Sequence, residues 1–159
     1  MANRRWLTDE ELTAWRAFVQ MRHTLERHLA LHLQREFGLS DSDFEILVNL
    51  SEAPTGGMRA YELARATHWE KSRLSHHLRR MEQRGLIRRE ESDARYPDIV
   101  LTKAGRKAIE TAAPPNAARV RELFVDVLGP DRMAVLQELS NDVLAAIGKH
   151  VATDCPLDQ

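Results

Sequence analysis

The chain has 159 residues, of which 43% are hydrophobic and 30% charged, and its formal net charge at pH 7 is −1. This balance is typical of a globular protein that buries a core and stays in solution. The sequence contains no apolar run long enough to span a bilayer and does not begin with the apolar stretch of a signal peptide, so we expect a cytoplasmic protein. One cysteine, Cys155, excludes an internal disulfide and a cysteine-based metal site.

Charge is distributed unevenly along the chain. Residues 55–110 contain 13 Lys and Arg against 8 Asp and Glu, a balance of +5, whereas residues 1–54 and 111–159 each have a balance of −3. A basic middle between acidic flanks indicates a surface for a polyanion in the middle and a different role for the flanks.

Helical spacing of apolar residues dominates the first half. Thr8 and Glu11 have the spacing of a capping box, which predicts the start of a long helix, and Gly38 suits its end. A second helix starts within residues 39–43 and stops before the turn at 54–57. A short helix over 59–66, a tight connection over 67–69 and a helix over 70–84 follow.

Two short strands, 86–90 and 97–101, are predicted next, with a polar turn over 91–96 between them. A helix starts at residue 102, and Pro114-Pro115 should interrupt or kink it. The helical pattern then resumes, turns at 129–131 and runs to about residue 150. This order predicts a mainly α fold with a small β-hairpin wing. Residues 39–110 are predicted to form a winged helix-turn-helix, and residues 1–38 and 111–159 are predicted to form its helical flanks.

The predicted helix over 70–84 has two different faces. Leu74, Leu78 and Met81 form a narrow apolar stripe, and no acidic residue lies between Lys71 and Met81. An ordinary solvated surface also shows basic residues, but this helix lies between a short helix and a basic hairpin. The pattern therefore predicts a helix that binds DNA through its polar face.

Several motifs occur together in the middle of the chain: Leu63-Ala64, Leu74, Leu78, Met81-Glu82, Arg84-Gly85-Leu86-Ile87, Asp93-x-Arg95 and Leu101-Thr102-x-x-Gly105-Arg106. In these motifs the chain resembles the MarR family of bacterial regulators, the multiple antibiotic resistance regulators. The resemblance implies a winged helix-turn-helix that binds DNA, with residues 1–38 and 111–159 as a helical dimerisation region. The sequence departs from the family at Ala94, which is often a second arginine, and at Pro97 and Asp98 on the second wing strand.

The resemblance also suggests which side chains approach DNA. Arg73 is the best candidate for guanine, because its two donors match guanine O6 and N7. Arg95 at the wing tip can enter the minor groove, with Asp93 shaping the turn. Trp69 is expected to pack into the core and not on a base. The predicted DNA-contacting residues are Lys71, Ser72, Arg73, Ser75, His76, Arg79, Arg80, Asp93 and Arg95.

The terminal helices have more apolar side chains than one domain needs to bury, which predicts a homodimer on a pseudo-palindromic operator in double-stranded DNA. We therefore expect a nucleoid-associated transcriptional regulator and take a repressor as the working hypothesis, although the sequence alone does not separate repressor from activator. For Trp15 and Phe18, packing in the dimer core is favoured over a pocket for a small aromatic effector, which the family resemblance implies. The apolar residues of the terminal helices that lead to the expectation of a homodimer are Leu123, Phe124, Val127, Leu136, Leu139, Val143, Leu144 and Ile147.

Two other classes of function compete with this interpretation. An enzyme is not expected, since the sequence has no phosphate loop or nucleophile motif, and no cofactor is predicted. His28 and His32 have a spacing that can bind zinc, and Glu36 lies one turn further, so a metal site there remains a minor alternative. A winged helix that docks on another protein is disfavoured by the positive balance of residues 55–110.

Overall fold

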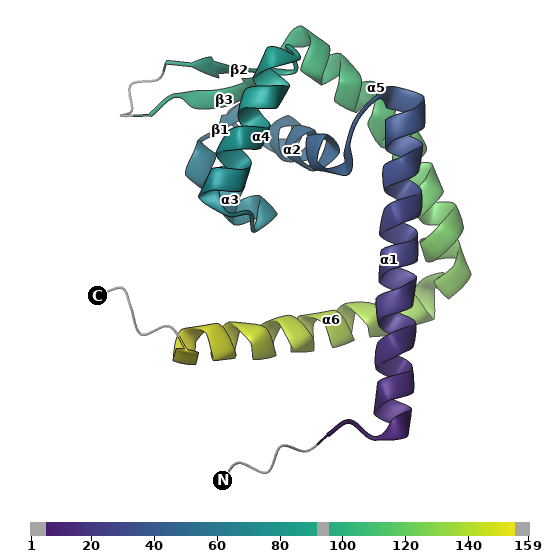
Figure 1. Ribbon diagram of the computed structural model, residues 1–159. Helices are drawn as coiled ribbons and strands as arrows, with labels where there is room; N and C mark the ends of the chain where they lie inside the picture. The colour runs from purple at the N-terminus through teal and green to yellow at the C-terminus, as the bar shows by residue number, and fades with distance from the viewer. Residues whose placement is uncertain (1–5, 92–95, 155–159) are drawn as a thin grey trace. The chain divides into compact units, whose positions relative to one another are not determined.

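The computed structural model describes the backbone of residues 6–91 and 96–154 and side chains as far as residue 150. The chain forms two compact units, Met1–Ala117 and Ala118–Gln159. The first unit contains α1 (Asp9–Phe37), α2 (Asp41–Glu52), α3 (Ala60–Thr67), α4 (Lys71–Gln83), a small sheet and most of α5 (Lys103–Val120) (Figure 1). The second contains the π-helical turn η1 (Arg121–Val125) and α6 (Asp126–Asp154).

Side-chain caps define where α1 and α2 begin. The Thr8 hydroxyl accepts from the Glu11 amide at 3.2 Å, and the Glu11 carboxylate accepts from the Thr8 amide at 2.8 Å. Ser40 and Asp43 form the same reciprocal pair at the start of α2. Gly38 ends α1 with a φ of 65°, a left-handed conformation that glycine adopts without strain. These predicted helix ends are confirmed.

The wing strands pair antiparallel. In β2 (Ile87–Glu90) and β3 (Asp98–Leu101), Ile87 lies opposite Leu101 and Glu90 opposite Asp98. A third strand, β1 (Gly57–Met58), pairs with the other edge of β3 and gives the order β1-β3-β2. β1 was not predicted, because two residues are too few to show alternation. The predicted winged helix-turn-helix fold is confirmed, and residues 92–95 at the wing tip lie outside the described residues.

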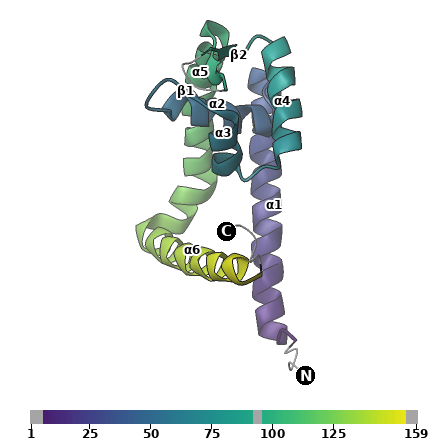
Figure 2. The same ribbon diagram turned by 90° about the vertical axis from the view of Figure 1, so that its left-hand side faces the viewer.

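The core of the first unit lies among α2, α3, α4 and the sheet. α4 contributes the apolar stripe of Leu74, Leu78 and Met81, each at most 2% exposed, as predicted. Figures 1 and 2 show α4 alongside α3. α1 enters this core at its C-terminal end, where Leu33 is the buried residue of that helix. The polar face of α4 is therefore left outside the core.

α5 continues through Pro114 and Pro115, so the predicted interruption at this pair is wrong. Each proline lacks the amide that would bond the carbonyl four residues earlier, at Glu110 and Thr111. Both of those residues are exposed, so water can bond to their carbonyls. The regular α-helical pattern changes further on, first in the π-helical turn η1 and then at Gly129, where a turn was predicted and φ is 71°.

The Leu101-Thr102-x-x-Gly105 motif fastens α5 to the end of the wing. The Thr102 hydroxyl donates to the Gly85 carbonyl at 2.6 Å and accepts from the Gly105 amide at 3.0 Å. The Thr102 amide donates to the Leu86 carbonyl at 3.1 Å. Gly105 lies so close to this carbonyl that an added Cβ would be 1.9 Å from the oxygen. Only glycine fits at this position without a shift of the backbone.

We predict that Gly105→Ala lowers the free energy of unfolding by about 1–3 kcal/mol, because the methyl group forces α5 away from β2. Gly148→Ala in α6 is the matched control, since a Cβ there meets nothing within 4 Å. The control should be neutral or stabilising by up to about 1 kcal/mol. Urea unfolding measures both, and equal stability of the two variants would contradict the close contact.

Candidate nucleic-acid interface

The outer face of α4 is polar and basic. Between Lys71 and Met81 this helix has no carboxylate, and Lys71, Arg79 and Arg80 form no ion pair with any residue that the structure describes. A helix face of this kind fits the phosphates and base edges of a major groove. The structure places seven of the predicted residues on exposed positions of α4: Lys71, Ser72, Arg73, Ser75, His76, Arg79 and Arg80.

The other two predicted residues, Asp93 and Arg95, fall within residues 92–95 and lie outside the described residues. On the adjoining strand, the Asp98 carboxylate lies 3.8 Å from the Arg59 guanidinium. An acidic side chain would repel phosphate if it faced DNA, but a cation already faces this carboxylate, which reduces such repulsion.

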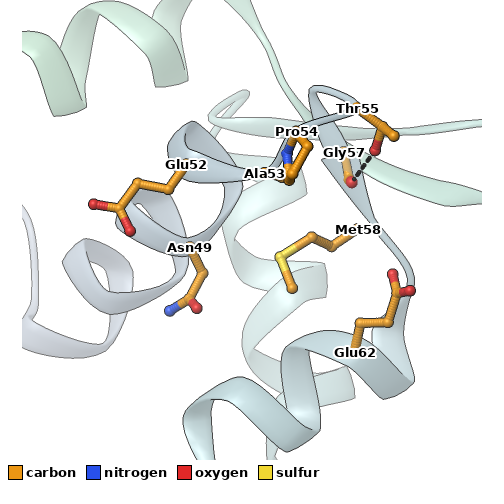
Figure 3. Close-up of a pocket in the computed structure, with 8 residues that line it drawn as sticks. All are labelled: Asn49, Glu52, Ala53, Pro54, Thr55, Gly57, Met58 and Glu62. Carbon is orange, nitrogen blue, oxygen red and sulfur yellow. Dashed lines mark hydrogen bonds between the residues drawn. The ribbon is translucent and has the colours of Figure 1, made fainter.

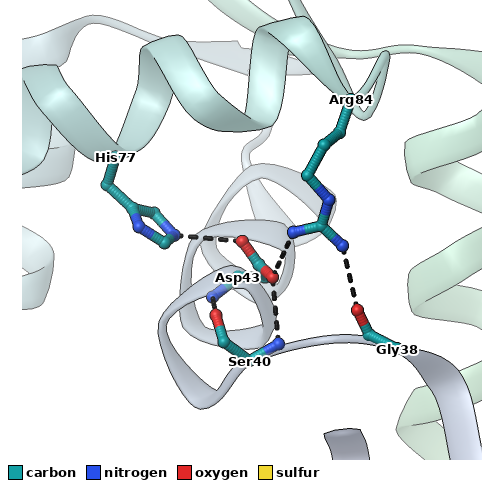
Figure 4. Close-up of polar contacts among 5 residues, drawn as sticks. All are labelled: Gly38, Ser40, Asp43, His77 and Arg84. Atoms are coloured by element: carbon teal, nitrogen blue, oxygen red, sulfur yellow. Dashed lines mark hydrogen bonds and ion pairs between the residues drawn. The ribbon is translucent and has the colours of Figure 1, made fainter.

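A buried carboxylate connects α4 to the start of α2 (Figure 4). Asp43 is 2% exposed and accepts from the Arg84 guanidinium at 2.6 Å and from the Ser40 amide at 2.9 Å. Arg84 also donates to the Gly38 carbonyl at 2.9 Å, so the C-terminal end of α4 is joined to the end of α1. The His77 Nε2 lies 3.1 Å from the second Asp43 oxygen, so a second position of α4 faces the same carboxylate.

The two ionisable groups of this cluster respond to burial in opposite ways. Burial raises the pKa of Asp43, but hydrogen bonds from Arg84 and Ser40 outweigh it, and the net pKa is lowered. Asp43 thus stabilises the fold above its unfolded pKa of about 3.9, and this contribution is lost as the pH falls through the lowered value. Burial lowers the pKa of His77 and exceeds the opposing effect of the Asp43 charge, while Arg80 and Arg73 lower it further.

None of these three residues, Asp43, His77 and Arg84, was predicted as part of the site. The capping-box position of Asp43 and the Arg84-Gly85 motif were visible in the sequence. The contact between Asp43 and Arg84 could not be inferred from the sequence, because 41 residues separate them.

Trp69 packs against the core, as predicted, and its outer face is occupied. The Arg73 guanidinium lies over the indole ring, with Cζ 4.0 Å from the ring centroid. The His77 ring contacts the same indole edge to face, with centroids 5.4 Å apart. Arg73, the residue predicted to read guanine, therefore already contacts the Trp69 side chain of its own chain.

A cavity of about 410 Å³ lies between the C-terminal end of α2, β1 and the start of α3 (Figure 3). Its lining includes Glu52, Met58 and Glu62 but none of the predicted site residues. Trp15 and Phe18 lie elsewhere, on α1, at 56% and 46% exposure, with ring centroids 5.8 Å apart. The proposed aromatic-effector site and this cavity are thus different places.

The histidines of α1 do not assemble a metal site in the part of the chain that the structure describes, where no group of three or more His, Cys, Asp and Glu is placed to hold a metal ion. His32 instead contacts Phe37 edge to face, with centroids 5.7 Å apart.

Within the same described part, no helix is both long and apolar enough to cross a membrane.

We predict that the stability of the protein falls on acidification below about pH 6.5, the ordinary histidine pKa, because unfolded His77 binds a proton that the folded state resists. His77→Gln should reduce this pH dependence of the free energy of unfolding between pH 8 and 5. His76→Gln, which alters the exposed neighbour, is the control and should leave it unchanged. If His77→Gln retains the wild-type pH dependence, burial of a neutral His77 is wrong.

Comparison with known proteins agrees with this geometry. A family model described as MarR family matches residues 37–95, which run from the end of α1 to the wing. The chain is 29% identical over 126 residues to the transcriptional regulator HosA of Escherichia coli, covering 78% of this chain and 91% of HosA.

Two solved structures of MarR family transcriptional regulators from Streptomyces coelicolor are more similar in sequence. AbsC is 43% identical, with a TM-score of 0.82 over 94% of this chain and 99% of AbsC. Sco3205, whose structure is a complex with DNA, is 35% identical, with a TM-score of 0.84 over 89% of this chain and 91% of Sco3205. The fold, the basic face of α4 and these similarities lead to one conclusion: the chain belongs to the MarR family of transcriptional regulators.

Proposed function

We propose that the protein is a homodimeric repressor that binds a pseudo-palindromic operator in double-stranded DNA. The observation that carries the proposal is the exposed face of α4, which is basic, has no carboxylate between Lys71 and Met81 and is backed by the core of a winged helix-turn-helix. The DNA complex of the similar regulator Sco3205 supports it. A dimer seated on an operator represses by excluding other proteins from the same DNA.

Different residues of this face are assigned different roles. Arg73 reads guanine, and Ser72, Ser75 and His76 bond to base edges or to the backbone. Lys71, Arg79 and Arg80 bind phosphates and set the register of the helix. In the wing, Arg95 enters the minor groove and Asp93 shapes the turn, as the sequence predicts.

Exposed apolar side chains support the homodimer. Every side chain of α6 described by the structure is at least partly exposed, although the helix is rich in aliphatic residues. On α1, Trp15, Phe18 and Met21 are between 42% and 56% exposed. We assign these surfaces to contact with a second copy of the chain. A pocket for a small aromatic effector at Trp15 and Phe18 stays a prediction. The exposed large apolar residues described in the second unit are Leu123, Val127, Val135, Leu139, Val143, Leu144 and Ile147.

Selection of bound sequences from a random duplex pool, at two salt concentrations, tests the proposal. We expect a two-fold symmetric motif whose half-sites are about 34 Å apart, the spacing of successive major grooves. Sedimentation of the free protein should give twice the mass of the chain. A monomeric protein, or an unselective pool whose binding only weakens with salt, would contradict a dimeric operator-binding protein.

Substitution of single arginines on α4 separates base contacts from phosphate contacts. Arg73→Ala should weaken binding to the selected operator by about 1–3 kcal/mol and leave binding to random duplex nearly unchanged. Arg79→Ala is the matched control. It should weaken binding to the operator and to random duplex equally, and it should lower the slope of log affinity against log salt concentration by about one, the contribution of one phosphate contact. Fluorescence anisotropy at several salt concentrations measures both effects. Equal losses on both duplexes for Arg73→Ala would make Arg73 a phosphate contact.

A further inference from the structure

Trp69 occupies a rigidly defined position just before α4. His68 has a φ of 55°, a left-handed conformation that is uncommon outside glycine, and it turns the chain out of α3. The Trp69 amide then donates to the Ala64 carbonyl at 3.2 Å. The backbone of Trp69 is thus anchored to the helix that precedes the turn.

The indole ring is held on several sides as well. It packs against the buried core, and the His77 ring meets it at an interplanar angle of 77°. Because the core and the His77 imidazole both contact the indole, its remaining exposed surface is a fixed platform.

Arg73 uses this platform. Arg73 is exposed, so its long side chain would otherwise sample many rotamers, and restricting them on binding costs entropy. Trp69 lies two residues before α4 and Arg73 lies in its first turn, and the Arg73 guanidinium lies over the indole ring, 4.0 Å from its centroid. The attraction between the cation and the ring face limits those rotamers before any DNA is bound.

We propose that Trp69 is a positioning residue for DNA recognition: it holds the Arg73 guanidinium on α4 and thereby sets how strongly the protein distinguishes guanine from other bases. The proposal rests on the proposed role of Arg73 in reading guanine. Trp69 itself needs no contact with DNA. Its contribution is preorganisation, since a side chain ordered in the free protein loses less entropy on binding.

The test compares Trp69→Leu, which keeps apolar bulk without an aromatic face, with Trp69→Phe, which keeps a smaller face. The readout is the ratio of affinities for the selected operator and for an operator altered at the base pair that depends on Arg73. Trp69→Leu should reduce this ratio about twofold to fivefold, and Trp69→Phe should retain most of it. Affinity for random duplex should stay constant, which separates positioning from a general loss of structure.

The same substitutions in an Arg73→Ala background complete the test. Trp69→Leu should have no further effect on the ratio there, because the side chain that it positions is gone. An equal effect in both backgrounds, or tighter operator binding by Trp69→Leu, would overturn the proposal; the second result would mean that the stack holds Arg73 away from DNA. If Arg73→Ala itself leaves the ratio intact, the proposed role of Arg73 fails, and the proposal for Trp69 fails with it.

A measurement on the wild-type protein covers the case in which Trp69→Leu does not fold. The indole ring current should shift the NMR signals of the Arg73 side chain upfield, and Trp69→Phe should reduce that shift. Signals of Arg73 that match those of the exposed Arg79 would overturn the proposal.

Discussion

The orientation of α4 depends on the burial of one carboxylate. Asp43 is 2% exposed, and removal of a charge from water is unfavourable unless other groups bond to it. Its partners come from the turn before α2 and from two positions on α4, His77 and Arg84. Since these positions lie seven residues apart, the carboxylate restrains both the height of α4 and its rotation about its own axis.

The same rotation is required by the core, which holds the neighbouring stripe of Leu74, Leu78 and Met81. A slip by one residue turns a helix by about 100°, which would expose this stripe and break the contacts with Asp43. Two unlike constraints, one apolar and one ionic, therefore specify a single presentation of the basic face. Trp69 extends this fixed orientation from the helix to one side chain, because its ring contacts both His77 and Arg73.

Local chemistry in the sequence was enough to predict most of the fold. The Thr8 cap of α1 and the apolar stripe of α4 depend on neighbours within a few positions. Features that depend on distant partners were missed: β1 needs β3 to exist as a strand, and the Asp43–Arg84 ion pair joins residues far apart in sequence. The error at Pro114 and Pro115 has another origin, because propensity penalises lost hydrogen bonds but does not show that solvent can replace them.

The requirement for specificity explains why the exposed apolar surface of α6 belongs with the basic face of α4. A base pair read well contributes about 1–3 kcal/mol of discrimination, and one α4 reaches only a few base pairs. A regulator must find its operator among about 10⁶–10⁹ competing sites, which a single short half-site cannot achieve. Two copies joined in the proposed homodimer read two half-sites and add their discrimination. Aliphatic side chains such as Val127, Leu139 and Leu144, left at 57–65% exposure in one chain, are then the means by which the second α4 is supplied.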